Sequence, residues 1–384
     1  MCVVYDCLYP WTVGGAERWY RNLAERLAQA GHDVTYLTRR QWSKSELPEV
    51  PGVSVIVVSR EEPLYGPDGN RRIGEALRFG WGVLRHLAKH RKQYDVVHTA
   101  SFPYFSLLAA AAIRPLGRYR LIVDWHEVWT KEYWQGYIGP LPGAIGHLVQ
   151  RACVLVRQEA FCFSRLHQAR LVSEGLRALP VLLEGEYAGP TSSPAPRLAG
   201  KTIVFAARQI REKNAPAVVQ TVAELKRRGI EVRAIIFGDG PERSRTNLEV
   251  ERLGLEETVE VPGFVPAGEL QDAMAQALCL LHPSEREGYG LVVIEAASMG
   301  TPVILARGAD NAATELVEPG VNGFIARSAS ANDLADAIEL VIDDGEDLRR
   351  STWDWFSANV ERLSMDRSIE AVMSAYSSEP RARS

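Results

Sequence analysis

The sequence predicts an α/β protein of two domains, each with a parallel β-sheet covered by helices. Its 384 residues exceed what one hydrophobic core usually organises. Short β-branched runs alternate with helical periods in two separate series, an alternation typical of parallel sheets with helices on both faces. Residues 189–196 lie between the two series and form a Pro- and Ser-rich stretch without periodicity, which predicts a linker.

The first series occupies residues 1–188, which we expect to form the N-terminal domain. Its expected strands are Cys2–Asp6, Asp33–Thr38, Val53–Val57, Asp95–His98 and Leu121–Asp124. One helix is expected over Gly15–Ala30, because apolar side chains recur there on one face, and another over about residues 72–92.

The second series is more regular, and we expect residues 189–352 to form the C-terminal domain. Its expected strands are Thr202–Ala207, Val232–Phe237, Val259–Val261, Cys279–His282 and Pro302–Leu305. The expected helices lie near residues 214–228, 241–253, 267–277, 291–299 and 329–343. Aromatic and aliphatic residues beyond position 352 predict a closing helical segment over residues 353–384.

Composition limits the class of protein. With 46% hydrophobic and 24% charged residues, the chain resembles an ordinary globular protein. The longest apolar run, Phe102–Ile113, is shorter than the roughly 20 residues that span a bilayer, and the N-terminus has no signal-peptide pattern. We therefore expect a soluble protein or one bound only to a membrane surface. The five cysteines lack CxxC spacing, which fits a reducing cytosol and argues against structural zinc.

The net charge of −4 is unevenly distributed along the chain. Residues 1–188 contain 23 Lys and Arg against 18 Asp and Glu, a net of +5, and the remainder contains 21 against 30, a net of −9. Such a basic half can meet an anionic partner, although chance variation between domains explains the difference equally well.

The strongest local signal is a pair of glutamates, Glu287 and Glu295, after the expected strand Cys279–His282. Glu287 could accept hydrogen bonds from sugar hydroxyls, and Glu295 could reach ribose hydroxyls, as an acidic residue does in dinucleotide sites. Alternatively, Glu287 merely favours the start of a helix and Glu295 is a surface charge. The apolar neighbours of Glu295 favour a functional role, because a charge in such a stretch usually has a partner.

Between these glutamates lies a glycine-rich turn, Gly288-Tyr289-Gly290-Leu291. The two glycines would let a ligand approach the backbone closely, because no Cβ intervenes. The turn opens a helix, whose first N–H groups lack partners and suit an anion such as a diphosphate. We therefore expect all four residues to line a site for a diphosphate-containing ligand.

This region closely resembles the signature of glycosyltransferase family 4, whose members retain anomeric configuration and have the GT-B fold. The segments that carry the resemblance are Pro283-Ser284, Glu287-Gly288, Gly290-Leu291, Glu295-Ala296 and residues 300–304, 315–317 and 320–324. The resemblance implies two Rossmann-like domains with parallel sheets facing across a cleft. It also implies that the second domain holds most of the donor, that the first holds most of the acceptor, and that residues 353–384 cross back to the first domain.

Two cations, Arg208 and Lys213, follow the expected strand Thr202–Ala207. An Arg fork and a Lys point charge at this spacing can clamp a diphosphate, and an exposed basic loop is the alternative. In the resembled family an Arg-x4-Lys pair neutralises the leaving diphosphate. Here Ala207 and Asn214 stand where that family usually has glycine, a departure that concerns loop geometry rather than charge.

Two further glycines follow strands of the second domain. Gly238 begins a loop that resembles the one positioning the donor nucleotide in the family, although a tight strand-to-helix turn explains it equally well. Gly263 follows Val259–Val261, and we expect it near the nucleobase.

In the first domain, Gly14 and Gly15 open the first expected helix and offer N–H groups to phosphate or sugar oxygens. The pair does not form a GxGxxG fingerprint, which weakens an NAD-binding interpretation. His126 follows the strand Leu121–Asp124, where the resembled family often places a histidine that hydrogen-bonds the donor sugar. A purely structural histidine is the alternative, and Asp124 is expected to bind acceptor or cap a helix.

The expected helix 72–92 is amphipathic and basic. One side carries Ile73, Leu77, Trp81, Leu84 and Leu87, and another carries Arg78, Arg85, Lys89 and Lys92. We expect the apolar side to pack into the core and the basic side to be available to anionic lipid headgroups. An ordinary domain helix with solvated charges fits the pattern equally well.

Together, the motifs and the resemblance predict a metal-independent, retaining hexosyltransferase-type enzyme in the cytoplasm or peripheral on the inner face of the membrane. The expected donor is a UDP- or GDP-sugar, and no separate cofactor, metal or nucleic acid is expected. The acceptor would be a saccharide, lipid-linked or small molecule. A GT-B nucleotide-sugar epimerase or hydrolase and a non-catalytic sugar-nucleotide-binding protein are the alternatives. A glycoside hydrolase built on Glu287 and Glu295 is disfavoured, because the surroundings signal phosphate binding.

Overall fold

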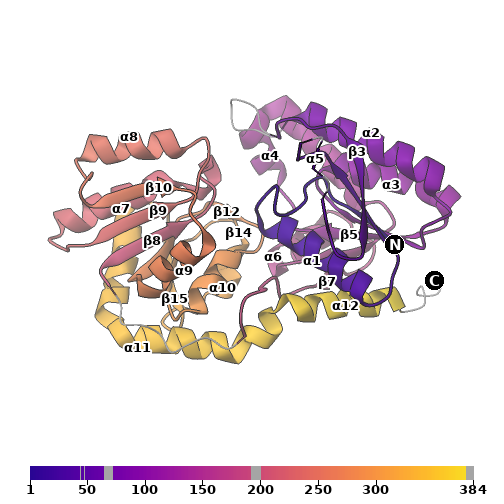
Figure 1. Cartoon of the computed structure of the whole chain (residues 1–384). Coiled ribbons are helices and arrows are strands. Elements are labelled where there is room, and N and C mark those ends of the chain that lie inside the picture. Colours follow the sequence, from indigo (N-terminus) through magenta and orange to yellow (C-terminus); the bar gives the residue numbers. More distant parts are fainter. Residues whose placement is uncertain (44, 47, 65–71, 192–199, 378–384) are drawn as a thin grey trace. The chain divides into compact units, whose positions relative to one another are not determined.

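The computed structural model describes residues 1–43, 45–46, 48–64, 72–191 and 200–377. The chain divides into two compact units: unit 1 comprises Met1–Glu186 with Met365–Ser384, and unit 2 comprises Tyr187–Ser364 (Figure 1). Most of the expected linker, residues 192–196, lies outside the described residues.

Unit 1 contains a parallel sheet of seven described strands in the order β3-β2-β1-β4-β5-β6-β7. The strands are β1 (Cys2–Val4), β2 (Val34–Arg39), β3 (Val53–Ser59), β4 (Val96–Ala100), β5 (Arg120–Trp125), β6 (Glu159–Cys162) and β7 (Val181–Leu182). The strand order reverses between β1 and β4. In open parallel sheets such a reversal leaves a crevice at the carboxyl ends of the strands, where ligands bind.

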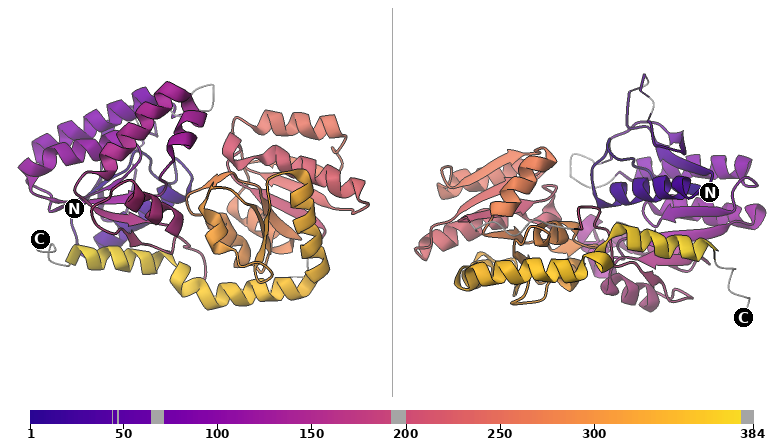
Figure 2. Two further views of the ribbon diagram at one scale, coloured as in Figure 1. Left: turned by 180° about the vertical axis from the view of Figure 1, so that it is seen from behind. Right: turned by 60° about the horizontal axis from the view of Figure 1, so that its bottom comes forward.

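The helices of unit 1 are α1 (Gly15–Gln29), α2 (Ile73–His90), α3 (Tyr104–Gly117), α4 (Lys131–Ile138), α5 (Pro140–Val154), α6 (Arg165–Ser173) and α12 (Met365–Ser377). Right-handed crossovers place α1 on one face of the sheet and α2, α3 and α5 together on the other. In that second layer α3 packs between α2 and α5 (Figure 2). The apolar run Phe102–Ile113 forms most of α3, with Leu107 and Ala110 fully buried in the core.

The expected orientation of α2 is wrong for Ile73, Leu77 and Trp81, although Leu87 is buried as expected. Its buried face is formed by Phe79, Val83 and Leu87, whereas Ile73 and Trp81 are each 62% exposed. The reason is a small-residue contact with α3: a Cβ on Gly80 would lie 2.6 Å from Phe105 Cβ, so only glycine lets the helices approach so closely. This close contact lies on the buried side of α2, together with Phe79 and Val83.

The last helix, α12, lies along α1 (Figure 2). Arg26 pairs with Asp366 at 2.5 Å, and the Gly185 backbone N–H donates to Ser368 Oγ at 3.0 Å. At the other end of α12, Arg120 donates to the carbonyl oxygens of Ala375 and Tyr376 at 2.7 and 2.8 Å. A cation at the carbonyl end of a helix complements its dipole, so Arg120 anchors α12 to unit 1.

Unit 2 contains a parallel sheet of six described strands in the order β10-β9-β8-β11-β13-β15, which reverses between β8 and β11. These strands are β8 (Thr202–Ala206), β9 (Arg233–Phe237), β10 (Val259–Gly263), β11 (Cys279–His282), β13 (Val303–Ala306) and β15 (Gly323–Ala326). A small parallel pair, β12 (Arg286–Glu287) with β14 (Asp310–Asn311), lies beyond the carboxyl ends of β11 and β13 in the chain. Both sheets are Rossmann-like, as expected.

The helices of unit 2 are η1 (Arg211–Lys213), α7 (Ala215–Arg227), α8 (Arg243–Leu253), α9 (Ala267–Gln276), α10 (Leu291–Ala297), η2 (Ala312–Leu316) and α11 (Ala331–Leu363). The helix expected near 329–343 therefore continues to Leu363, with a kink at Gly345, where φ is +51°. Unit 2 ends at Ser364, so residues 353–363 extend α11 and the remainder of the closing segment belongs to unit 1.

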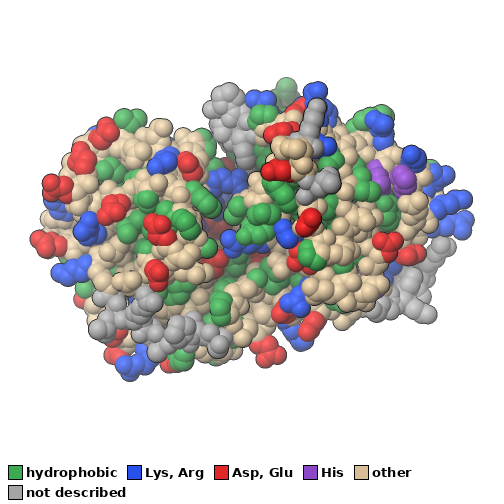
Figure 3. Space-filling view, in the orientation of Figure 1, with side chains coloured by type: hydrophobic (Ala, Val, Ile, Leu, Met, Phe, Trp, Pro, Cys, Tyr) green, Lys and Arg blue, Asp and Glu red, His purple; other side chains and the backbone are tan. Residues whose placement is uncertain are grey.

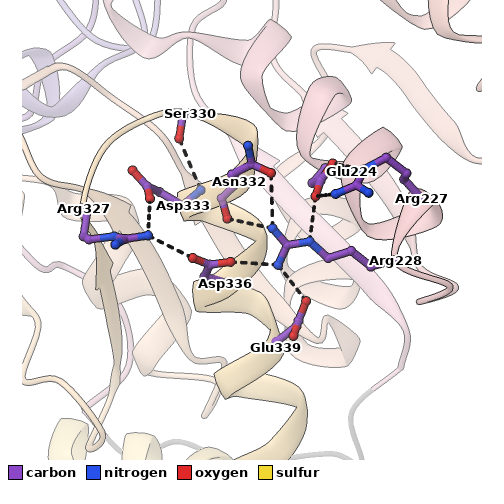
Figure 4. A network of polar contacts seen from close by, with 9 residues as sticks. All are labelled: Glu224, Arg227, Arg228, Arg327, Ser330, Asn332, Asp333, Asp336 and Glu339. Atoms are coloured by element: carbon purple, nitrogen blue, oxygen red, sulfur yellow. Dashed lines mark hydrogen bonds and ion pairs between the residues drawn. The ribbon is translucent and has the colours of Figure 1, made fainter.

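A surface network joins α7 to α11 (Figure 4). Arg228, at the end of α7, bonds Glu224 at 2.7 Å and both Asp336 and Glu339 at 2.8 Å. Arg327 approaches Asp336 from the other side at 3.2 Å. The Arg228 guanidinium thus holds the C-terminus of α7 against the first turns of α11. This contact fixes the position of α11 against α7.

Candidate active site

The candidate donor residues lie at the carboxyl ends of β8 and β11, on both sides of the strand-order reversal in unit 2. Arg208 and Lys213 follow β8, and Glu287 follows β11. Because β8 and β11 are hydrogen-bonded neighbours, their following loops emerge side by side. The topology therefore places both sequence motifs at one point of the sheet.

Glu287 lies at the centre of this region and is buried. Lys213 Nζ donates to Glu287 Oε1, which also lies 2.5 Å from His282 Nε2. Burial alone would raise the pKa of Glu287, but the charges and hydrogen bonds of Lys213 and His282 outweigh burial and hold this pKa well below its usual range. The carboxylate is therefore ionised and held in place by two donors.

His282 was expected only as the end of a strand and was not among the candidate site residues. It is the last residue of β11 and is 1% exposed, although its imidazole is polar. A polar side chain that ends an otherwise apolar buried strand, five residues before Glu287, is the signal that could have identified it. Its contact with Glu287 makes it part of the candidate site.

The short helix η1 positions Lys213 by docking on the loop after β11. The Glu212 carbonyl oxygen accepts hydrogen bonds from Glu285 N at 2.9 Å and from Ser284 Oγ at 3.1 Å. The chain then turns at Asn214, which has φ +53° and ψ +45°. Asparagine is among the few residues that tolerate this left-handed conformation, which explains how it replaces the glycine of the family pattern.

The glycines expected to contact donor have structural requirements of their own. Gly290 has φ +99°, and a Cβ there would lie 2.5 Å from Ala313 Cβ. Gly238 has φ +105°, and a Cβ there would lie 1.9 Å from the Ala207 carbonyl oxygen. The Gly238 N–H donates to Gly263 O at 2.8 Å, so the loops after β9 and β10 are joined. Only glycine fits at the first two positions, whatever ligand the loops hold.

The other candidates in unit 2 differ in accessibility. Arg208 is exposed on the loop between β8 and η1. Gly288 and Leu291 are half-buried, but Tyr289 is buried, at 7% exposure, so its side chain presents little surface to a ligand. Glu295 is half-buried on α10. Arg208 is therefore the exposed charged candidate of unit 2, and Lys213 and Glu295 are partly accessible.

In unit 1, His126 follows β5 and stacks on Phe163, with ring centroids 4.4 Å apart. Its Nδ1 atom lies 3.4 Å from Glu186 Oε1. Burial would lower the pKa of His126, but the hydrogen bond and charge of Glu186, with the charge of Asp124, outweigh burial and raise it. The imidazole is thus oriented by an aromatic ring and a carboxylate, neither of which the sequence identified as its partner.

Beneath His126 lies a buried polar network around Asp124, which is fully inaccessible. Asp124 Oδ2 accepts from Trp19 Nε1 at 2.8 Å, and Asp124 Oδ1 lies 2.7 Å from His98 Nε2. His98 Nδ1 in turn lies 2.5 Å from the hydroxyl of Tyr376. Burial would raise the pKa of Asp124, but the charge and hydrogen bond of His98 outweigh it and lower the pKa. Asp124 is therefore a structural carboxylate rather than an exposed acceptor ligand.

Gly14 and Gly15 lie at the start of α1, where the carboxylate of Glu17 folds back over the backbone. A Cβ on Gly14 would lie 2.3 Å from Glu17 Oε2, and Glu17 is 7% exposed. A negative charge at this helix end complements the helix dipole. It also disfavours a phosphate there and favours the hydroxyls of a neutral sugar.

In the part of the chain that the structure describes, no group of three or more His, Cys, Asp or Glu side chains is arranged to hold a metal ion. Among the same residues, none of the helices combines the length and apolar character needed to cross a bilayer.

Two family models match the chain. The model of glycosyl transferases group 1 matches residues 193–352, and the model of glycosyltransferase family 4 matches residues 13–176. The D-inositol 3-phosphate glycosyltransferase of Xylanimonas cellulosilytica is 27% identical over 401 residues, which cover 96% of this chain and 93% of that enzyme. The alpha-D-kanosaminyltransferase of Streptomyces kanamyceticus is 28% identical over 144 residues, and this match spans only 37% of that enzyme.

A solved structure shares the fold. The Anabaena protein HepE, in complex with UDP and glucose, superimposes with a TM-score of 0.72 at 19% identity, covering 98% of this chain and 99% of that one. The family 4 model covers β2 to β6 of unit 1, and the group 1 model covers all six strands of the unit 2 sheet. The chain therefore belongs to the group 1 glycosyl transferases of glycosyltransferase family 4, and it is a glycosyltransferase with the GT-B fold.

Proposed function

We propose that the protein is a retaining, metal-independent hexosyltransferase that transfers a sugar from a UDP- or GDP-sugar to a saccharide acceptor. The observation that carries the proposal is the buried, ionised Glu287, held by Lys213 and His282 where the strand order of unit 2 reverses. The similarity to HepE, which was solved with UDP and glucose, supports a uridine nucleotide as the first donor to test.

The diphosphate is proposed to bind over the loop after β8. Arg208, exposed on this loop, would form a planar fork to the phosphate oxygens, and Lys213 would add a point charge. The two cations would then supply the charge that a metal ion provides in other transferases. Stabilising the departing diphosphate is the main catalytic contribution of this site, because negative charge develops there as the glycosidic bond breaks.

Retention is proposed to occur because the acceptor hydroxyl attacks the anomeric carbon from the same face from which the diphosphate departs. Glu287 is a poor candidate for a nucleophile or general base, since Lys213 and His282 engage its carboxylate and lower its pKa. A weakly basic carboxylate removes a proton from a sugar hydroxyl inefficiently. The leaving phosphate is the better base, and Glu287 would instead orient donor hydroxyls.

The remaining contacts divide between nucleotide and sugars. Glu295, half-buried on α10, is proposed to accept from the ribose hydroxyls, and Gly263 to lie beside the base. In unit 1, His126 is proposed to bind the donor sugar, and Glu17, over Gly14 and Gly15, to accept from acceptor hydroxyls. A lipid-linked saccharide acceptor is the more specific proposal, and a small soluble acceptor is the alternative.

A donor screen with stereochemical readout tests the proposal. Thermal denaturation of the full chain with UDP-, GDP- and ADP-sugars is expected to show stabilisation by one class of donor, as mass action requires of a bound ligand. Stabilisation should be lost in Arg208→Ala and Glu295→Ala and preserved in Arg233→Ala. Arg233 begins β9, at the end of the strand away from the site, and its exposed side chain pairs with Glu260 on β10.

With the donor identified, nuclear magnetic resonance of the first product formed is expected to show the same anomeric configuration as the donor. An inverted product would contradict the retaining mechanism. Stabilisation by the donor that persists in both Arg208→Ala and Glu295→Ala would contradict the assigned donor site.

A further inference from the structure

The outer side of the helix layer in unit 1 carries large apolar side chains that face solvent. On α2 and α5, six of them are between 49 and 74% exposed: Ile73, Leu77, Trp81, Leu141, Ile145 and Leu148. Isolated exposed apolar residues are ordinary, but aligned rows on neighbouring helices usually mark an interaction surface. We call these six residues the apolar face.

The spacing of these residues makes each row continuous. Those on α2 are four residues apart, and those on α5 are four and three apart, so each set follows one side of its helix. The opposite sides of both helices are buried, at Phe79 and Val83 on α2 and at Cys153 on α5. Because α2 and α5 flank α3 on the same face of the sheet, both rows point away from the sheet.

The two apolar rows lie toward the edge of the unit 1 sheet that carries the candidate site residues. In a parallel sheet each crossover helix begins near the carboxyl end of one strand and runs back toward the amino ends. The apolar residues of α2 occupy its first half, and Leu141 and Ile145 occupy the first half of α5. The apolar face therefore lies toward the edge of the unit 1 sheet at which His126 and Gly14 are found.

The charge of the same three helices is strongly one-sided. Among α2, α3 and α5, the Lys and Arg residues are Arg78, Arg85, Lys89, Arg114 and Arg151, and the one acidic residue, Glu75, is 1% exposed. Figure 3 shows Lys, Arg and His side chains gathered over the end of unit 1 where α2 finishes. An apolar row beside such a basic surface complements an anionic bilayer, whereas a second copy of the same basic face would repel it.

We propose that the outer face of α2, α3 and α5 docks unit 1 on an anionic lipid bilayer. Trp81 and the aliphatic residues of the apolar face would enter the headgroup region, where aromatic rings are favoured. Arg85 and Lys89, exposed in the second half of α2, would contact lipid phosphates. The sugar-binding edge of unit 1 would thereby lie close to the membrane surface. This proposal concerns binding to lipid and does not require the proposed transferase reaction.

Flotation of the full chain with lipid vesicles tests the docking. The protein is expected to float with vesicles of mixed phosphatidylcholine and phosphatidylglycerol and to remain unbound with phosphatidylcholine alone. The apolar variant Trp81→Gln/Leu148→Gln and the charge variant Arg85→Glu/Lys89→Glu should each lower the bound fraction at least about tenfold, since apolar burial and charge act together. Because all four side chains are exposed or solvated, the melting temperature should not change.

A control variant places one change of each kind on unit 2. Leu248 and Arg245 on α8 are 64% and 69% exposed, and Leu248→Gln/Arg245→Glu should float like the wild type. Equal flotation of all variants, flotation with neutral vesicles, or no flotation at all would overturn the proposal. So would loss of self-association in the apolar variant, which would make the face a contact between copies. Donor stabilisation measured without vesicles separates failed docking from failure of the proposed function.

Discussion

Replacing Lys213 by methionine is expected to lower kcat by about a hundredfold to a thousandfold, the range found when one group that stabilises developing charge is removed. Methionine keeps much of the length of the side chain and removes the ammonium. KM should change much less than kcat, because the leaving diphosphate carries more negative charge in the transition state than in the bound donor. Steady-state kinetics with the identified donor provide the measurement.

Lys213→Met also has a structural effect, and a second variant controls for the loss of a cation from η1. Lys213 also pairs with Glu287, which is buried and keeps His282 as its remaining partner when the ammonium is lost. Part of the effect could therefore arise from a displaced Glu287. Arg211→Met, on the exposed side of the same η1 helix, is the control and should leave kcat near the wild-type value. A Lys213→Met enzyme with unchanged kcat would contradict the assigned role.

Replacing Asp124 by alanine is expected to lower the free energy of unfolding by about 3–5 kcal/mol at neutral pH, because it leaves buried partners of a carboxylate without their acceptor. Trp19 and His98 both lose their contact with Asp124, and His98 links it to Tyr376 on α12. Asp124→Asn retains the volume and should lose less. Chemical denaturation monitored by tryptophan fluorescence gives the measurement.

The pH dependence of this difference follows from the direction of the pKa shift. The pKa of Asp124 is lowered in the folded protein from its ordinary value of 3.8, so the carboxylate contributes its full stability above that pH. The contribution is lost as pH falls through the lower, folded-state pKa. The free-energy difference between wild type and variant should therefore be constant near neutrality and shrink below pH 3.8. Asp95→Asn, at an exposed position of unit 1, should show no comparable difference.

The sequence predicted the strands of unit 2 more accurately than the helices of unit 1. The expected strand Cys279–His282 coincides with β11, since a short apolar run bounded by turns has a well-defined length. In contrast, α5 begins with Pro140-Leu141-Pro142 and exposes its apolar row, so its pattern does not indicate a buried helical face. The helices α4 and α6 are short and were likewise not expected.

For the candidate site, the motifs gave residue identities but not contacts. Glu287 and Lys213 were each singled out, yet their ion pair spans 74 positions and depends on the docking of η1 against the loop after β11. The partners of Asp124 come from α1 and β4, and those of His126 come from the residues after β6 and after β7. No local pattern relates those parts of the chain. Tertiary packing also decided the orientation of α2, where a close glycine contact with α3 lies on the buried side.

In the proposed function, the loops after β8 and β11 bind the diphosphate of a nucleotide-sugar. Calorimetric titration of wild type and Arg208→Ala with a nucleoside diphosphate and with the same nucleoside lacking phosphate tests it most directly. Arg208→Ala is expected to weaken binding of the diphosphate by at least about tenfold, because one charged hydrogen-bonding group is lost. Binding of the nucleoside should be unchanged. Equal affinity of both proteins for the diphosphate, or an equal loss for diphosphate and nucleoside, would contradict it.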